Sequence, residues 1–261
     1  MSAMQFSLVD IAVPFRMQPG LRRLDPRDPQ ITALDPASAL HREKLAVMES
    51  GQSRLAVPGF DPSGAIAAMR ERVPSALPPE IAYEQDFAVL DGETGTLKWL
   101  CVCVPSHWAP EDKIGLDFPS VHAPVADNKL LVSSAAQLVK LATSGDCWER
   151  FVWTITPSGR YDQHPRRHMR EPWPPLQDPS AFAQQLWLRA ERQTFFPVAG
   201  AHQSVFTIRV MLQPLPESVQ APGAARKLHD ALSTMSDAVL AYKGLAPARD
   251  RLLAWLSHRA A

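Results

Sequence analysis

The spacing of apolar residues changes along the chain, from helical spacing near the N-terminus to alternation in the middle and helical spacing again at the end. A helix is predicted over residues 35–50. An Asp-Pro pair can cap its start, and one helical face then carries Leu40, Lys44 and Val47. A second Asp-Pro pair at positions 61 and 62 predicts another helix that ends before Pro74. Both helices follow an extended lead-in.

Residues 85–106 change to the pattern of a β-hairpin. Phe87 and Val89 alternate with smaller or polar residues, the run 97–104 is strand-like, and an Asp-Gly pair supplies the turn. Helical signals follow, ending in a clear helix over residues 127–145 with Asp127 or Asn128 as its cap and Gly145 as its stop.

Three more strands are predicted over residues 147–156, 186–198 and 204–214, and two helices over residues 223–244 and 246–260. The order of two strands, a helical insert and three strands predicts an α+β fold. We expect a five-stranded antiparallel sheet with helices over one face, plus N-terminal and C-terminal helices.

We expect this chain to form one compact unit with three parts. Residues 1–80 form an N-terminal extension with two helices packed on the core, residues 81–215 form the sheet domain, and residues 216–261 form a C-terminal helical extension.

The strand over residues 186–198 carries an unusual number of polar side chains. Because side chains alternate along a strand, Arg189, Glu191 and Gln193 share one face. If this strand pairs with the next one, we expect Arg209 to lie near these three residues. One interpretation is a solvated outer face with weak cross-strand charge pairs. The other is the polar wall of a pocket, able to anchor an anion or to move a proton.

Charge and composition narrow the functional classes. The chain has 261 residues with 27 basic and 27 acidic side chains, so it lacks the net charge typical of proteins that bind nucleic acid or anionic membranes. No apolar run is long enough to span a bilayer, and the N-terminal residues do not resemble a signal peptide. The three cysteines lack metal-site spacing and indicate buried thiols in a reducing compartment, which predicts a cytoplasmic protein.

The segment "LWLRAERQTFFPVAGAHQSVFTIRVML" resembles the signature of the haem-dependent oxidative N-demethylase family, of the α-subunit type. The segments "GLRRLDP", "VPSHW", "DKIG" and "VHAPV" resemble other blocks of that family in the same order, so the resemblance covers residues 20–213.

The resemblance implies a PAS-like sheet domain that binds haem b, and the element order is also that of a PAS domain. It implies oxidation of a small secondary amine with O₂. It also implies a separate reductase subunit that carries flavin and an iron–sulfur cluster, because this chain has no dinucleotide-binding glycine motif and no P-loop.

Haem iron is commonly bound by a neutral histidine, and the chain has eight. His122 is the predicted ligand, because it falls in the insert between the second and third strands, where haem-binding PAS domains place theirs, and in the family-like block. Val121 and Val125 beside it suit an apolar cofactor wall. The alternative is a buried histidine satisfied by a backbone carbonyl.

The proposed roles are as follows. His122, Val121, Val125 and Arg189 bind the cofactor, with His122 on the metal, while Glu191, Arg209 and Gln193 form the catalytic polar wall. The alternative function is a non-catalytic haem-binding PAS-type gas or redox sensor or carrier. A third interpretation is a haem-free descendant that mediates protein contacts.

A second histidine pair, His164 and His168, has the four-residue spacing of some zinc sites. Pro165 puts His164 at or before the start of a helix, so the two histidines need not share a face. Arg166 and Arg167 would repel a cation. We therefore expect a basic or solvated loop here and no zinc.

Overall fold

Seven strands account for the centre of the molecule in the computed structural model, which describes residues 6–25 and 27–260. The strands are β1 (Arg22–Leu24), β2 (Arg54–Ala56), β3 (Asp86–Asp91), β4 (Leu97–Cys101), β5 (Cys147–Thr156), β6 (Trp187–Pro197) and β7 (Gln203–Pro214). Within the described residues they form one sheet in the order β1-β5-β6-β7-β3-β4-β2, with every pair antiparallel.

The sheet confirms the α+β class, but the prediction of five strands was wrong. The N-terminal part of the chain adds β1 beside β5 and β2 beside β4, one at each edge. Each of these strands has three residues, which is too short for an alternating pattern to show in the sequence. β1 and β2 are strands because they pair with β5 and β4, and their own sequences contain no pattern that predicts this pairing.

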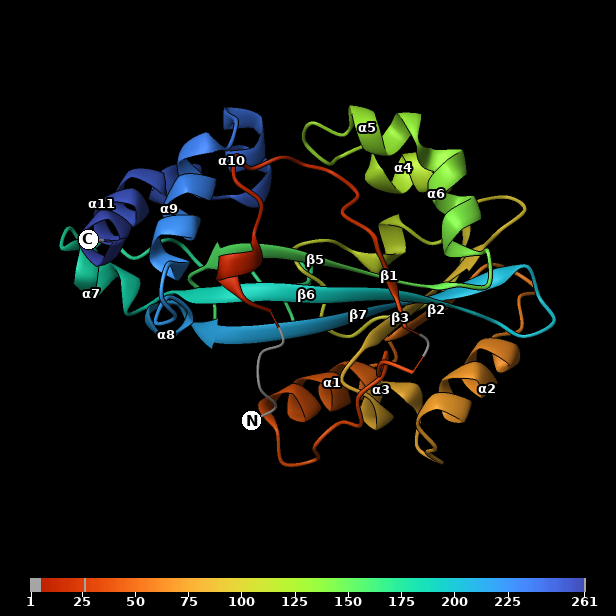
Figure 1. Cartoon of the computed structure of the whole chain (residues 1–261). Coiled ribbons are helices and arrows are strands. Elements are labelled where there is room, and N and C mark those ends of the chain that lie inside the picture. Colours follow the sequence, from red (N-terminus) through yellow and green to blue (C-terminus); the bar gives the residue numbers. More distant parts are fainter. Residues whose placement is uncertain (1–5, 26, 261) are drawn as a thin grey trace.

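The helices gather in three groups around the sheet (Figure 1). The N-terminal helices are α1 (Ala39–Glu49), α2 (Ser63–Arg72) and α3 (Pro79–Ala82), and the insert between β4 and β5 holds α4 (Phe118–His122), α5 (Lys129–Ser133) and α6 (Ala135–Ala142). The remaining α-helices are α7 (Pro179–Ala183), α8 (Leu215–Ser218), α9 (Ala224–Thr234), α10 (Asp237–Lys243) and α11 (Arg249–Ala260). Short 3-10 helices are η1 (Leu8–Asp10), η2 (Pro110–Asp112) and η3 (Ala246–Ala248).

Two predicted helices are each divided in the structure. The helix expected over residues 127–145 becomes α5 and α6, because Ser134 leaves helical geometry at ψ 7°. The helix expected over residues 223–244 becomes α9 and α10, because Met235 is extended and Ser236 caps a new helix by accepting a hydrogen bond from the Val239 N–H. No helix of the described residues has the length and apolar character to cross a membrane.

The two faces of the sheet differ at β5 and β6. On one face, Trp153, Ile155, Leu188 and Ala190 pack against the C-terminal helices through side chains such as Leu252. On the other face, the same two strands present Arg150, Glu191 and their polar neighbours. The polar face also borders an apolar cluster, because Ile208 and Val210 of β7 lie opposite Gln193 and Glu191 and pack with Leu40 and Val104.

A buried ion pair fastens α1 to the start of β3. Lys44 is fully buried, donates to the carbonyls of Tyr83 and Gln85, and lies 3.1 Å from Asp86. The other oxygen of Asp86 accepts from the Val104 N–H at 2.7 Å. The lysine on the predicted helical face therefore fixes the end of the hairpin, next to the segment that enters the candidate site.

Candidate functional site

The register between β5, β6 and β7 decides which polar side chains share a face. Glu191 lies opposite Val152 on β5 and Val210 on β7, and Arg189 and Gln193 are two residues away on either side. These three side chains therefore share one face of the sheet, as predicted.

Arg209 lies on the opposite face, so the prediction that it neighbours Glu191 was wrong. It pairs across the strands with Arg192, and its Nε donates to Glu84 at 2.5 Å. The alternating pattern alone leaves two registers open, and a shift of one residue exchanges the faces. The observed register places Arg209 outside the polar wall.

Glu191 is held by two donors. The Ser106 hydroxyl donates to one carboxylate oxygen, and the Gln193 side-chain amide donates to the other at 2.7 Å. Ser106 in turn accepts a hydrogen bond from Arg189 Nε at 2.7 Å. A continuous chain of hydrogen bonds therefore runs from Arg189 through Ser106 to Glu191, and it fixes the direction of the carboxylate.

Arg189 is buried and its donors serve protein groups. Nη2 donates to the Val104 carbonyl at 3.0 Å and Nη1 to the Arg160 carbonyl at 3.2 Å. Burial lowers the pKa of Arg189 to about 10, although the charge of Glu191 acts in the opposite direction. Arg189 remains a cation at neutral pH and joins three segments beneath the polar wall.

His122 ends α4 within the insert. Its Nδ1 donates to the Phe118 carbonyl at 2.8 Å, and its ring lies against the Phe118 ring with 4.1 Å between centroids. A carbonyl only accepts, so this bond puts the proton on Nδ1 and leaves a lone pair on Nε2. Burial lowers the pKa of His122, which favours the neutral ring that a metal needs.

Val121 and Val125 flank His122 and are half-buried. Lys113 donates to the Val121 carbonyl at 2.8 Å, and the Val125 N–H donates to the His122 carbonyl at 3.0 Å. These backbone contacts hold the turn that carries the histidine.

Sequence reasoning missed Arg150, which lies on β5 directly opposite Gln193. Burial lowers its pKa and the nearby charge of Glu191 raises it, while Arg150 itself contributes to lowering the pKa of His122. Arg150 therefore lies near both the polar wall and the predicted iron ligand. The sequence offered one indication, a charged residue at an alternating position of "CWERFVWTIT". The same pattern is equally typical of a solvated arginine on a strand.

His107, next to Ser106, has an unusual backbone and a perturbed side chain. Its φ is +59°, in the left-handed region that costs free energy for a residue with a Cβ atom. Burial, with Arg170 and Arg189 nearby, lowers the pKa of His107 to about 4. Backbone strain of this kind gathers at functional sites, and the block "VPSHW" that contains His107 is the only sequence signal for it.

The His164 and His168 loop is fixed by contacts with acidic side chains. His164 contacts Glu111 at 3.0 Å, while Asp162 binds both Arg167 and His168. Within residues 6–25 and 27–260 no group of three or more histidine, cysteine, aspartate or glutamate side chains has an arrangement that would hold a metal ion.

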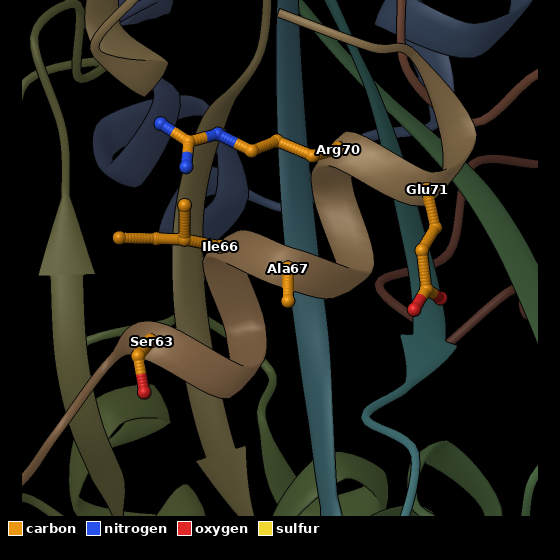
Figure 2. A pocket seen from close by; sticks show the side chains of 5 residues that line it. All are labelled: Ser63, Ile66, Ala67, Arg70 and Glu71. Carbon is orange, nitrogen blue, oxygen red and sulfur yellow. The ribbon is translucent and has the colours of Figure 1, made fainter. Parts of the chain in front are cut away.

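Two surface hollows lie on α2, away from the polar wall. One, of about 640 Å³, is lined by Arg70, Pro74, Ser75 and Ala76. The other, of about 530 Å³, is lined along the helix from Ser63 to Glu71, and its side chains spread out without meeting at a common point (Figure 2). Both are open to solvent and lack the converging polar groups of a binding site.

A family model described as haem-dependent oxidative N-demethylase, alpha subunit-like, matches residues 81–253. This span contains His122, Arg150 and the whole Arg189–Ser106–Glu191 chain.

Proposed function

Since the chain belongs to the haem-dependent oxidative N-demethylase, alpha subunit-like family, we propose that it is the haem-binding subunit of an oxidase that demethylates a small secondary amine. The family match carries this proposal, together with the hydrogen bond that leaves Nε2 of His122 free.

The side chains around His122 suit a haem b group. A metal-binding histidine usually donates its other ring N–H to a carbonyl or a carboxylate, as His122 does to Phe118. Val121 and Val125 offer apolar contact, and the buried Nε atom of Arg150 and Nε1 atom of Trp148 have no hydrogen-bond partner among the described residues. A haem group, with an apolar ring and two carboxylates, meets both requirements.

Bound haem would supply the O₂-dependent redox chemistry that side chains do not provide. The chain's own residues would place the substrate: Glu191, held by Ser106 and Gln193, would accept a hydrogen bond or a proton from the amine nitrogen. Arg209 has no part in this proposal, because it lies on the other face of the sheet.

We further propose that residues 81–215 form a PAS-like haem domain. The short edge strands β1 and β2 come from the preceding residues and extend its sheet. The central five strands run β4-β3-β7-β6-β5 with the insert between β4 and β5, which supports this proposal. Electrons would come from a separate reductase subunit with flavin and an iron–sulfur cluster. The three buried free cysteines support a cytoplasmic location.

The test is a haem titration followed by visible spectroscopy. The wild-type chain should take up one haem per chain and show a Soret band that shifts on reduction with dithionite. His122→Ala should lose stoichiometric binding, whereas His258→Ala, on the exposed end of α11, should bind as the wild type does. An unchanged spectrum in His122→Ala would show that the ligand is another residue. Failure of the wild type to bind haem would overturn the proposed function.

Formaldehyde release tests the reaction itself. The haem-loaded chain with a flavin and iron–sulfur reductase should release formaldehyde from dimethylamine, and Glu191→Gln should release it more slowly because the carboxylate is lost while the size is kept. Haem binding without any release would favour a sensor or carrier.

A further inference from the structure

Arg150 differs from the buried arginines Arg189 and Arg192 because its buried Nε has no acceptor among the described residues. The Arg150 side chain is half-buried, and its Nε is buried without a hydrogen-bond partner among the described residues. By contrast, Arg192 binds Glu149 and the Pro29 carbonyl, and Arg189 has three acceptors. A buried N–H donor without an acceptor costs free energy, so the Nε–H of Arg150 indicates a place for a ligand acceptor.

The nearest carboxylate does not fill this role. Glu191 accepts hydrogen bonds from Ser106 and Gln193, and no hydrogen bond or ion pair joins it to Arg150. Glu191 therefore affects Arg150 through its charge, without bonding to it.

The charges that face Arg150 come from three elements. The sheet contributes Glu191 and the insert contributes His122. The end of α10 contributes Tyr242 and Lys243. Cations therefore outnumber carboxylates here, which favours a ligand with one negative charge. A doubly charged phosphate would be repelled by the neighbouring Glu191.

A second donor points to the same chemistry. Trp148 lies two residues before Arg150 on the same face of β5, and its buried Nε1 also lacks a partner among the described residues. The guanidinium fork binds the two oxygens of a carboxylate side by side. We propose that Arg150 binds the carboxylate of a small molecule, with Trp148 as a second donor.

Two molecules could bring this carboxylate: the haem, through a propionate, or an amine substrate that itself carries a carboxylate. The choice between these sources rests on the proposed function, but the binding of a carboxylate by Arg150 does not.

The first experiment uses the haem-free chain with arginine labelled in heavy nitrogen, followed by NMR. The buried Nε–H of Arg150 should give a resolved signal, assigned by its disappearance in Arg150→Gln. Propionate and N-methylglycine should shift this signal saturably, and dimethylammonium should not. Arg42→Gln, an exposed arginine on α1, is the matched control and should respond as the wild type does.

The second experiment separates the two sources by titrating haem and its dimethyl ester, in which both propionates are blocked. If a propionate is the ligand, esterification should weaken binding to the wild type by about 10- to 100-fold and leave Arg150→Gln unaffected. If a substrate carboxylate is the ligand, the ester should bind both proteins equally, and N-methylglycine should still shift the Arg150 signal with haem bound.

Two results together would show that the inference is wrong. The first is that no carboxylate probe shifts the Arg150 signal, with or without haem. The second is that wild type and Arg150→Gln bind haem with equal affinity, and also bind the ester with equal affinity. If the wild type binds no haem, the proposed function fails, and the propionate titration still decides the role of Arg150. The comparison of haem with its dimethyl ester in the wild type does not depend on whether Arg150→Gln folds.

Discussion

Arg189 Nε and Ser106 Oγ lie 2.7 Å apart, across 83 residues of sequence, and this contact orders the polar face of the sheet. Through it the buried cation of β6 reaches the hydroxyl that donates to Glu191. The conformation of the segment after β4 and the direction of the carboxylate are therefore linked.

Ser106→Ala should destabilise the chain by about 1–3 kcal/mol, because Arg189 and Glu191 each lose a partner while buried. Urea denaturation measures this loss. Ser106→Thr keeps the hydroxyl and should recover part of it. A Ser106→Ala variant as stable as the wild type would show that solvent replaces the hydroxyl and that Ser106 does not fix Glu191.

His107 should make folding stability depend on pH. Its pKa is about 4 in the folded chain and 6.5 in the reference state, so the unfolded chain binds more protons between these values. Acidification from pH 6.5 toward pH 4 should therefore lower the free energy of unfolding. Above pH 6.5 the contribution of His107 to this free energy should be constant.

The matched variant for His107 is His107→Asn, because asparagine tolerates a φ of +59° and does not titrate. The urea midpoint should fall less steeply with acid in this variant than in the wild type. Parallel curves for the two proteins would assign the acid sensitivity to other groups.

Arg209→Met should cost about 3–5 kcal/mol, since it leaves Glu84 without its buried cation. Haem affinity should be unchanged in the folded protein, because Arg209 faces away from Glu191. The double variant with Glu84→Gln should recover part of the stability. A change in haem affinity at constant stability would place Arg209 in the site after all.

Ser236→Ala should loosen the first turn of α10. The Ser236 side chain caps this helix and also donates to Asp127 at 2.8 Å, which joins the insert to the C-terminal helices. The loss should be about 0.5–2 kcal/mol, with faster hydrogen exchange at the Val239 N–H. Ser236→Thr should retain slow exchange, and equal exchange in all three proteins would exclude a capping role.

The long elements could be predicted from the sequence because their patterns are local. The strands that became β5, β6 and β7 span ten residues or more. The last insert helix ends at Ala142, three residues before the predicted stop at Gly145. What could not be predicted depends on distant partners. β1 and β2 have no pattern of their own, and the side of the sheet that Arg209 occupies is set by a register that two alternating strands leave open.

The same limit applies to the candidate site. Glu191 and Gln193 were predicted as neighbours because they alternate on one strand. Ser106 could not be chosen over the other serines, since its partners come from β6. Arg150 looked like an ordinary surface arginine, because only the folded structure shows that its Nε is buried without an acceptor.

The outer edge of β5 has a consequence for how the protein behaves among its own copies. Among the described residues, β1 pairs with β5 only from Cys147 to Glu149, which leaves the edge beyond Arg150 without a neighbouring strand on that side. Lys243 at the end of α10 donates to the Trp153 carbonyl of this edge at 2.6 Å. An uncovered edge invites pairing with a strand of another molecule. Lys243 and α10 thus cover part of this edge and hinder its pairing with another molecule. A chain that lost α10 would tend to aggregate through β5.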